Sequence, residues 1–210
     1  MTTISKSIQG GEFLIRDTEA QAIFIPEEFT EEQRMMAQAC QDFIDTEINP
    51  NIEEIDSMKN PQLVPSLFKK AGELGLLGIS VPEEFGGLGM SFNTSMLIAD
   101  IIGGAGSFST TYGAHTGIGT LPILYYGTEE QKQKYLPKFA SGEMVGAIAM
   151  SEPSAGSDLQ GVKTSAIKQS DGSYLLNGSK TFITNGVYAD YYVVAAKTKP
   201  ELGNKGISIF

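Results

Sequence analysis

The chain has 210 residues, 41% of them apolar, and its 25 acidic and 15 basic side chains give a formal net charge of -10. This size suits one large or two small globular domains, and because the basic residues are scattered rather than clustered, we expect no nucleic acid partner. No apolar run has the about 20 residues of a membrane-spanning helix, and the first residues resemble neither a signal peptide nor a transit peptide, so we expect a cytoplasmic protein without a transmembrane segment.

Residues 1–29 are interpreted as an amino-terminal extension and residues 30–142 as an α-helical domain. Thr30 and Gln33 form a capping box ahead of an apolar stripe with three-and-four spacing, which predicts an amphipathic helix that ends before Pro50. The stripe consists of Met36, Cys40, Phe43, Ile44 and Ile48. Because the single cysteine lies in this stripe, we expect it to be a buried small side chain rather than a reactive thiol.

Two further helices are predicted from helix start and stop signals. One begins at Pro65 and ends at Gly75. The other covers residues 93–105, where Asp100 is the only charge; because this run is apolar nearly all round, we expect it to lie inside a bundle. Glycines continue as far as Gly119, which predicts close approach between backbones.

A last, charged helix follows in the helical part. Thr128 and Gln131 repeat the capping box at its start. Pro137 is expected to interrupt this helix and Gly142 to end it.

Beyond residue 142 the pattern changes to short runs rich in Val, Ile, Thr and Tyr, which are typical of β-strands. The runs are MVGAIAM, VKTSAIKQ, SYLLNG, KTFIT, YYVVAAK and GISIF. Asp171-Gly172 and Asn185-Gly186 favour β-hairpins. We therefore predict an α+β fold, in which residues 143–210 begin a β-domain. Because the last run reads as a strand just begun at Phe210, we expect a fragment of a longer protein.

Several common sites can be excluded. The glycines around Gly104 and Gly106 do not complete a GxGxxG motif, and GSKT at residues 178–181 lacks the earlier glycine of a P-loop. His115 is the only histidine, which excludes a site with several histidine ligands to a metal. A structural role for His115 is the expected one.

The segment SEPSAGSD, at residues 151–158, directly follows an apolar strand. Its hydroxyls, acidic residues, proline and glycine predict a polar turn that exposes several main-chain N–H groups. Composition alone leaves two alternatives open, a decorated β-turn or a binding site. As a binding site it has hydrogen-bond donors but no side chain usable as a base. It is therefore better suited to hold a cofactor than to break a bond.

Four stretches resemble, in order, stretches typical of the acyl-CoA dehydrogenase family. They are LGLLGISVPEEFGGLGMS, YGTEEQKQKYLPKFASGE, AMSEPSAGSDLQGVKT and LNGSKTFITNGVYAD. The resemblance implies an amino-terminal helical domain, a middle β-barrel domain and a carboxy-terminal helical bundle, with FAD between barrel and bundle. The chain would hold the first domain and the first part of the second. GGEFLI near the start is similar to the longer-chain branch of the family.

The resemblance also implies which residues contact the cofactor. They are Ile148, Ala149, Met150, Ser151, Gly156, Ser157, Phe182, Ile183 and Thr184. In the family pattern the Ser151 hydroxyl donates toward the reactive nitrogen of the flavin, and the Met150 main chain addresses the pyrimidine edge. Gly156 and Ser157 would lie at the pyrophosphate, and Ser157 would also border the acyl-CoA substrate.

The second implied segment would hold the flavin from one face. Phe182 would pack on the face opposite the substrate, while Ile183 and Thr184 would hydrogen-bond near the ring edge. Many relatives carry tryptophan in place of Phe182 and threonine in place of Ser151, and both changes keep the required property. Without the family, Phe182 could equally be a core aromatic and Ser151 a strand-end serine.

The implied reaction is the removal of two hydrogens from the carbons next to a thioester. In the family a glutamate from the carboxy-terminal bundle takes the α proton, so the catalytic base is expected outside residues 1–210. Glu152 is not expected to serve as this base. The resemblance further implies fatty acid β-oxidation, an electron-transferring flavoprotein as acceptor, and a homodimer or homotetramer; the fragment alone is expected to be inactive.

Two other functions stay open. An acyl-CoA oxidase or flavin monooxygenase of the same fold would let oxygen reach the flavin. A non-catalytic assembly module would bind no cofactor, and the absorption spectrum would distinguish it.

Overall fold

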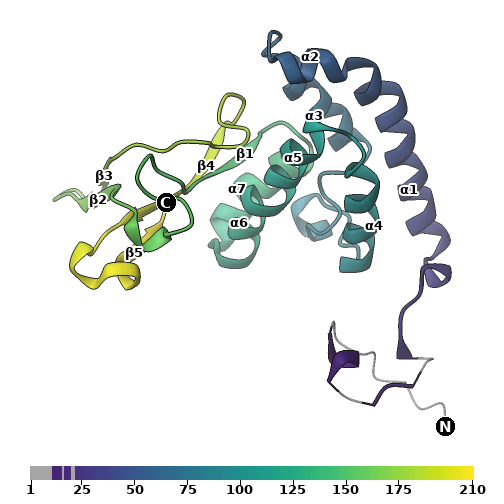
Figure 1. The fold of residues 1–210 in the computed structure, drawn as a ribbon, viewed down its shortest axis with the longest axis horizontal. Coiled ribbons are helices and arrows are strands. Elements are labelled where there is room, and N and C mark those ends of the chain that lie inside the picture. The colour runs from purple at the N-terminus through teal and green to yellow at the C-terminus, as the bar shows by residue number, and fades with distance from the viewer. Residues whose placement is uncertain (1–10, 16, 20–21) are drawn as a thin grey trace.

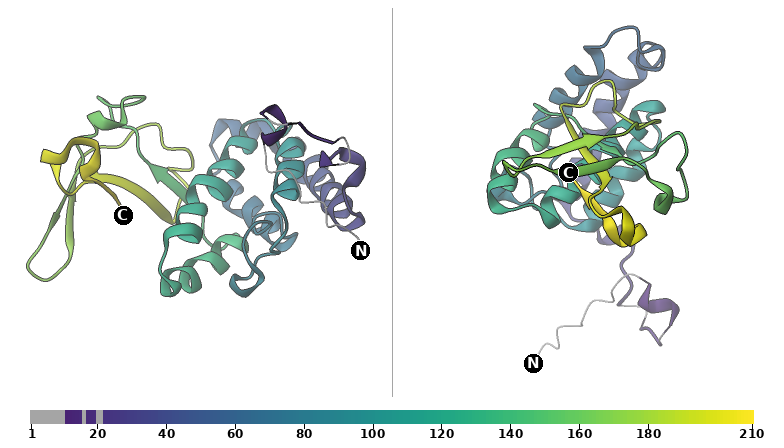
Figure 2. Two further views of the ribbon diagram at one scale, coloured as in Figure 1. Left: turned by 90° about the horizontal axis from the view of Figure 1, so that it is seen from below. Right: turned by 90° about the vertical axis from the view of Figure 1, so that its left-hand side faces the viewer.

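The computed structural model describes residues 11–15, 17–19 and 22–210 of the chain. The helices lie at one end of the molecule and the strands at the other, and β1 and β4 lead away from the helices (Figures 1 and 2). The predicted order, a helical part followed by a mixed sheet, is confirmed. Within the described residues, no helix combines the length and the apolar character needed to cross a membrane.

Among the residues that the structure describes, the helical part contains seven α-helices, some of them joined by short 3-10 or π-helical segments. The α-helices are α1 (Glu31–Phe43), α2 (Ile52–Ser57), α3 (Leu63–Glu73), α4 (Phe92–Ile102), α5 (Ser107–Gly113), α6 (Leu121–Tyr126) and α7 (Glu129–Ala140). Two π-helical segments, at Ile44–Ile48 and Ala114–Gly119, extend α1 and α5.

Both predicted capping boxes are present. The Gln33 N–H donates to Thr30 Oγ1 at 3.2 Å, and the Thr30 N–H donates to Gln33 Oε1 at 2.9 Å. Thr128 and Gln131 repeat this geometry at the start of α7. Each box satisfies two main-chain donors that a helix start leaves unpaired, which is why the sequence located these two starts.

The effects of the prolines on the helices were predicted less well. Helix α3 begins at Leu63 rather than at Pro65, which lies inside its first turn, where a missing N–H costs little. The expected interruption at Pro137 is wrong, because α7 continues through it to Ala140. Pro137 lies in the last turn, so few helical hydrogen bonds follow it. Gly142, with φ of 71°, comes directly after the cap of α7, as predicted.

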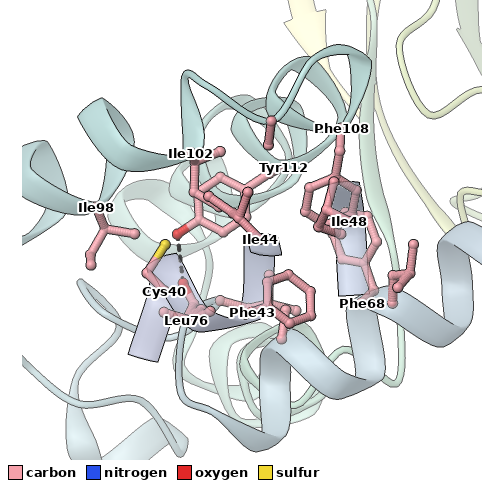
Figure 3. Packing of buried hydrophobic residues seen from close by; sticks show 14 of the residues in the cluster. Cys40, Phe43, Ile44, Ile48, Phe68, Leu76, Ile98, Ile102, Phe108 and Tyr112 are labelled. Carbon is pink, nitrogen blue, oxygen red and sulfur yellow. Dashed lines mark hydrogen bonds between the residues drawn. The ribbon is translucent and has the colours of Figure 1, made fainter. Parts of the chain in front are cut away.

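The core of the helical part is a cluster of apolar side chains from α1, α3, α4 and α5 (Figure 3). Cys40 and Phe43 of α1 are buried there, together with Phe68 of α3 and Phe108 of α5. The Tyr112 hydroxyl donates to the Leu76 carbonyl at 2.6 Å, as the dashed line in Figure 3 shows. Cys40 is fully buried in this cluster, which confirms its predicted packing role, and this burial raises the pKa of its thiol to about 12.

Helix α4 is exposed on one side, so the prediction that it lies inside the bundle is wrong. Ile98 and Ile102 are buried, but Phe92 is 72% and Met96 is 47% exposed. Apolar side chains occur on both sides of the helix, whereas α1 and α5 cover only one side. The exposed side borders an apolar groove of about 480 Å³ that Tyr112 and other residues of α5 also line.

In the described part of the chain the sheet contains five strands, in the order β1-β4-β2-β3, with β5 paired to β4. The strands are β1 (Gly146–Ala149), β2 (Ser165–Lys168), β3 (Tyr174–Asn177), β4 (Tyr191–Lys197) and β5 (Ile207–Ile209). β1 and β4 are parallel, with Gly146 opposite Tyr191. β2 and β3 form an antiparallel hairpin around Asp171-Gly172, as predicted.

The hairpin predicted at Asn185-Gly186 is wrong, and so is the strand predicted for KTFIT. Residues 178–190 form an irregular connection from β3 to β4. Asn185 has the positive φ of 66° that its sequence favours, but the turn it makes does not join two paired strands. β4 pairs instead with β1, β2 and β5, and none of these strands leads directly into it through this turn.

His115 connects the two parts of the molecule. It is fully buried at the end of the helical part, between α7 and the beginning of β1. Beside it, Gly119 packs directly on Gly146, where an added Cβ would come within 2.9 Å of the Gly146 carbonyl carbon. The predicted structural role of His115 is confirmed. Close contact was predicted between helices along this glycine-rich stretch, but Gly119 meets a strand instead, and Gly113 and Gly117 have nothing within 4 Å of an added Cβ.

Candidate functional site

The loop SEPSAGSD begins one residue beyond β1, after Met150. The Glu152 N–H donates to the Ala155 carbonyl at 2.8 Å, and the Ala155 N–H donates back to the Glu152 carbonyl at 3.1 Å. These two bonds close a tight turn, with Pro153 and Ser154 exposed at its tip. The loop therefore contains the predicted polar turn, and its position is set by the pairing of β1 with β4.

The segment 178–184 lies against this loop. The Thr181 N–H donates to the Ser151 carbonyl at 3.0 Å, across thirty positions of the chain. Gly178 at the start of this segment packs against the chain that leads into β2, where a Cβ would come within 2.2 Å of Thr164 Oγ1. The two stretches that the sequence singled out are thus adjacent in space.

Phe182 presents an exposed aromatic ring. Its side chain is 94% exposed and its backbone has φ of 54°, a left-handed conformation that is uncommon for a bulky residue. The alternative that Phe182 is a core aromatic is therefore wrong. Ile183 and Thr184, which follow it, are half-buried. A large apolar ring held in solvent by an unfavourable backbone conformation is a candidate platform for a planar ligand.

Two hydroxyls border this platform. Ser151 lies two residues after the end of β1 and is half-buried, as its alternative role of a strand-end serine would also require. Within the described residues, neither the Ser151 nor the Thr184 hydroxyl has a hydrogen-bond partner, so both can donate to a ligand. Ala149 is buried in β1 and Ile148 is half-buried, and they orient the Met150 main chain that follows.

The far end of the loop presents main-chain donors. Gly156 and Ser157 are exposed, and in the described part of the chain no hydrogen bond involves their N–H groups. A Cβ added at Gly156 would meet nothing within 4 Å, so a ligand can approach this backbone closely. Adjacent free N–H groups in a loop suit an anion such as a phosphate group.

Glu152 is a buried carboxylate, 6% exposed. It accepts hydrogen bonds from the Lys163 N–H at 2.7 Å, from the Thr164 N–H at 2.9 Å and from the Thr164 hydroxyl at 2.5 Å. Lys180 Nζ lies 3.0 Å from the same carboxylate. Burial alone raises the pKa of Glu152, but these hydrogen bonds outweigh it and lower the pKa to about 2. A carboxylate so fully bound is a poor base, as the sequence indicated.

Asn185 joins the turn to both parts of the molecule. Its Nδ2 donates to the Thr111 carbonyl of α5 at 3.0 Å and to the Gly146 carbonyl of β1 at 3.2 Å. Its Oδ1 is buried without a partner among the described residues. The sequence analysis missed the supporting roles of Asn185, Glu152 and Lys180. Glu152 lies inside one candidate segment and Lys180 just before the other, but their opposite charges alone do not indicate that the two segments meet.

Taken together, the two segments offer an aromatic plane, two free hydroxyls and a pair of free main-chain N–H groups. This set fits a planar heteroaromatic ligand that carries phosphate groups. It contains no residue suited to remove a proton. Nor do the described residues contain a group of three or more His, Cys, Asp or Glu side chains that could hold a metal ion.

Comparison with known proteins gives matches along nearly the whole chain. Residues 30–143 match the model of the acyl-CoA dehydrogenase N-terminal domain, and residues 147–210 match that of the acyl-CoA dehydrogenase middle domain. A probable acyl-CoA dehydrogenase of Bacillus subtilis is 50% identical over 190 residues, which are 90% of this chain and 32% of the relative. A mitochondrial isovaleryl-CoA dehydrogenase of Solanum tuberosum is 45% identical over 184 residues, 87% of this chain and 44% of the relative.

Among solved structures, the crystal structure of an acyl-CoA dehydrogenase complexed with FAD from Bacillus anthracis is similar, with a TM-score of 0.88 and 44% sequence identity. The similarity covers 97% of this chain and 34% of that chain. The chain therefore spans less than half the length of these relatives.

Proposed function

Because the chain belongs to the acyl-CoA dehydrogenase family, we propose that it is part of an FAD-dependent enzyme that converts an acyl-CoA thioester to the 2-enoyl-CoA. The observation that carries this proposal is the hydrogen bond from the Thr181 N–H to the Ser151 carbonyl, at 3.0 Å. It joins the two segments that would hold the flavin. We further propose the domain division at residues 1–29, 30–142 and 143–210.

Each free group of the site has a proposed partner on FAD. The Ser151 hydroxyl and the Met150 main chain address the flavin ring, Phe182 stacks on it, and Ile183 and Thr184 bind its edge. Gly156 and Ser157 bind the pyrophosphate, and Ser157 also borders the acyl-CoA. The free hydroxyls and N–H groups of these residues, and the exposed ring of Phe182, support this assignment.

Bound FAD supplies the hydride acceptor for the β hydrogen of the substrate. The residues of this chain bind and orient the flavin, donate hydrogen bonds to its ring and cover part of it from water. We assign no proton transfer to them, because Glu152 is held by four hydrogen bonds. The base is a glutamate from outside residues 1–210.

The substrate is proposed as an acyl-CoA, within fatty acid or related acyl oxidation. Relatives include both a probable acyl-CoA dehydrogenase and an isovaleryl-CoA dehydrogenase, so straight and branched acyl chains both belong in the test. An electron-transferring flavoprotein is the proposed electron acceptor, and a homodimer or homotetramer the proposed assembly.

The test uses the full-length protein that carries this chain. We expect a yellow protein with flavin absorption bands, which bleach without oxygen when the matching acyl-CoA is added. Electrons should then pass to an electron-transferring flavoprotein rather than to oxygen. Direct peroxide formation in air would instead support an acyl-CoA oxidase or monooxygenase. A colourless protein that cannot be reconstituted with FAD would overturn the proposal in favour of a non-catalytic module.

A further inference from the structure

Lys180 lies between the two segments of the site. Its Nζ donates to the Met150 carbonyl at 3.0 Å and to Glu152 Oε1 at 3.0 Å. The side chains of Lys180 and Glu152 are only 12% and 4% exposed. Lysine side chains usually lie exposed at the protein surface. A lysine that is nearly buried and donates to a main-chain carbonyl therefore requires a specific explanation.

The Glu152 carboxylate holds this lysine in place. It is anchored from its other side by the main-chain N–H groups of Lys163 and Thr164 and by the Thr164 hydroxyl. The pair therefore acts as a fixed dipole, whose negative end is bound to the chain leading into β2 and whose positive end rests on the Met150 carbonyl. Because both groups are buried, water screens this dipole weakly.

The contact acts on one particular peptide group. The Met150 carbonyl and the Ser151 N–H belong to the same peptide unit, so a cation on the oxygen draws electron density from the N–H and makes it a stronger donor. Met150 and Ser151 are also the residues proposed above to address the flavin ring. Negative charge that develops on a bound ring when it accepts a hydride would be stabilised by this peptide, whose N–H the ammonium makes a stronger donor.

We propose that Lys180 is a positioning residue that raises the reduction potential of the bound flavin by polarising the Met150–Ser151 peptide, and that Glu152 fixes Lys180 for this purpose. This inference rests on the proposed function. It differs from a purely structural role in one measurable respect. If Lys180 only held the two segments together, its loss would weaken the binding of oxidised and reduced FAD equally. If its charge acts on the flavin, its loss changes the difference between these two affinities.

The test compares three variants in the full-length protein. Lys180→Met removes the ammonium and leaves Glu152 with three donors. Lys180→Arg keeps the positive charge. Lys197→Met is the matched control, because Lys197 Nζ also donates to a main-chain carbonyl, that of Gln160 at 3.0 Å, but does not contact the Met150–Ser151 peptide. The affinity for FAD and the two-electron potential of the bound flavin are measured for each variant.

We expect Lys180→Met to weaken FAD binding about tenfold and to make the flavin potential more negative. Lys180→Arg should recover most of both losses, and Lys197→Met should change neither. An unchanged potential in Lys180→Met, with or without weaker binding, would overturn the proposal. If this variant does not fold, Lys180→Gln is measured instead with the same expected shift. Failure of the wild-type protein to bind FAD would refute the proposed function itself, which is a separate outcome.

Discussion

The main-chain N–H of Gly146 donates to Nδ1 of His115 at 3.0 Å, so the first strand is hydrogen-bonded to the end of the helical part. Because Nδ1 accepts this bond, the proton of the neutral ring must lie on Nε2, which donates to the Phe139 carbonyl at 3.0 Å. The rings of Phe68 and Phe139 pack edge-on around the imidazole. The histidine is therefore held neutral in one tautomer.

This arrangement predicts a loss of stability in mild acid. Burial lowers the pKa of His115 to about 4, and its hydrogen bond to the Phe139 carbonyl offsets only part of this shift. Between the unfolded pKa of about 6.5 and the folded value, the unfolded chain binds more protons, so stability decreases as the pH falls. We expect this residue to account for a loss of about 2 kcal/mol between pH 7 and pH 5 in urea unfolding. His115→Gln should be less stable at pH 7 and should lack this slope; equal slopes would contradict the assignment.

The contact between Gly119 and Gly146 predicts a strict size limit. A Cβ at Gly119 would lie 2.9 Å from the Gly146 carbonyl carbon and 3.0 Å from the Ala114 carbonyl oxygen. Gly119→Ala should therefore lower the free energy of unfolding by about 1 to 3 kcal/mol. Gly117→Ala is the control, because a Cβ there meets nothing within 4 Å and alanine favours a helix. A Gly119→Ala variant as stable as Gly117→Ala would show that the backbones can separate without cost.

Phe182 is predicted to serve ligand binding rather than folding. Its ring is 94% exposed, so Phe182→Ala should change the free energy of unfolding by less than about 0.5 kcal/mol. Loss of the stacking surface should nevertheless weaken FAD binding about tenfold, measured by fluorescence titration of the full-length protein. Val187, 71% exposed in the following turn, provides the control, since Val187→Ala removes apolar surface outside the proposed site. Equal affinities for the two variants would argue against the platform.

Asn185 combines a backbone requirement with a side-chain requirement, and two substitutions can separate them. Asn185→Gly keeps the positive φ of 66° without strain but loses the bonds to the Thr111 and Gly146 carbonyls. Asn185→Ala loses these bonds and adds the strain of a left-handed conformation, which costs about 1 kcal/mol more. We expect both variants to be destabilised in thermal and urea unfolding, with alanine the worse. If alanine and glycine behave alike, the backbone conformation at this position is not fixed.

Local signals in the sequence predicted local structure well. The capping boxes at Thr30 and Thr128 and the Asp171-Gly172 turn depend on neighbouring residues only, and each is present in the structure. The two stretches proposed to bind flavin were identified through family resemblance, and a hydrogen bond from the Thr181 N–H to the Ser151 carbonyl joins them in the structure.

Features that depend on distant partners were not predicted. Asn185-Gly186 has the composition of a hairpin turn, but its side chain bonds to α5 and β1, and β4 pairs with a strand far earlier in the chain. The apolar sequence of α4 does not indicate how many neighbouring helices will cover it. The Glu152–Lys180 pair likewise exists only because two segments meet, and neither residue alone indicates it.

The parallel pairing of β1 with β4 also bears on the order in which the molecule acquires its structure. Ser151 and Phe182 both lie in the chain between these strands, so their segments meet only once that long loop has closed. Non-local parallel pairings form slowly, since loop entropy is lost before contacts compensate for it. Flavin capture would therefore be a late event in folding, and a flavin bridging Ser151 and Phe182 would resist the separation of β1 from β4.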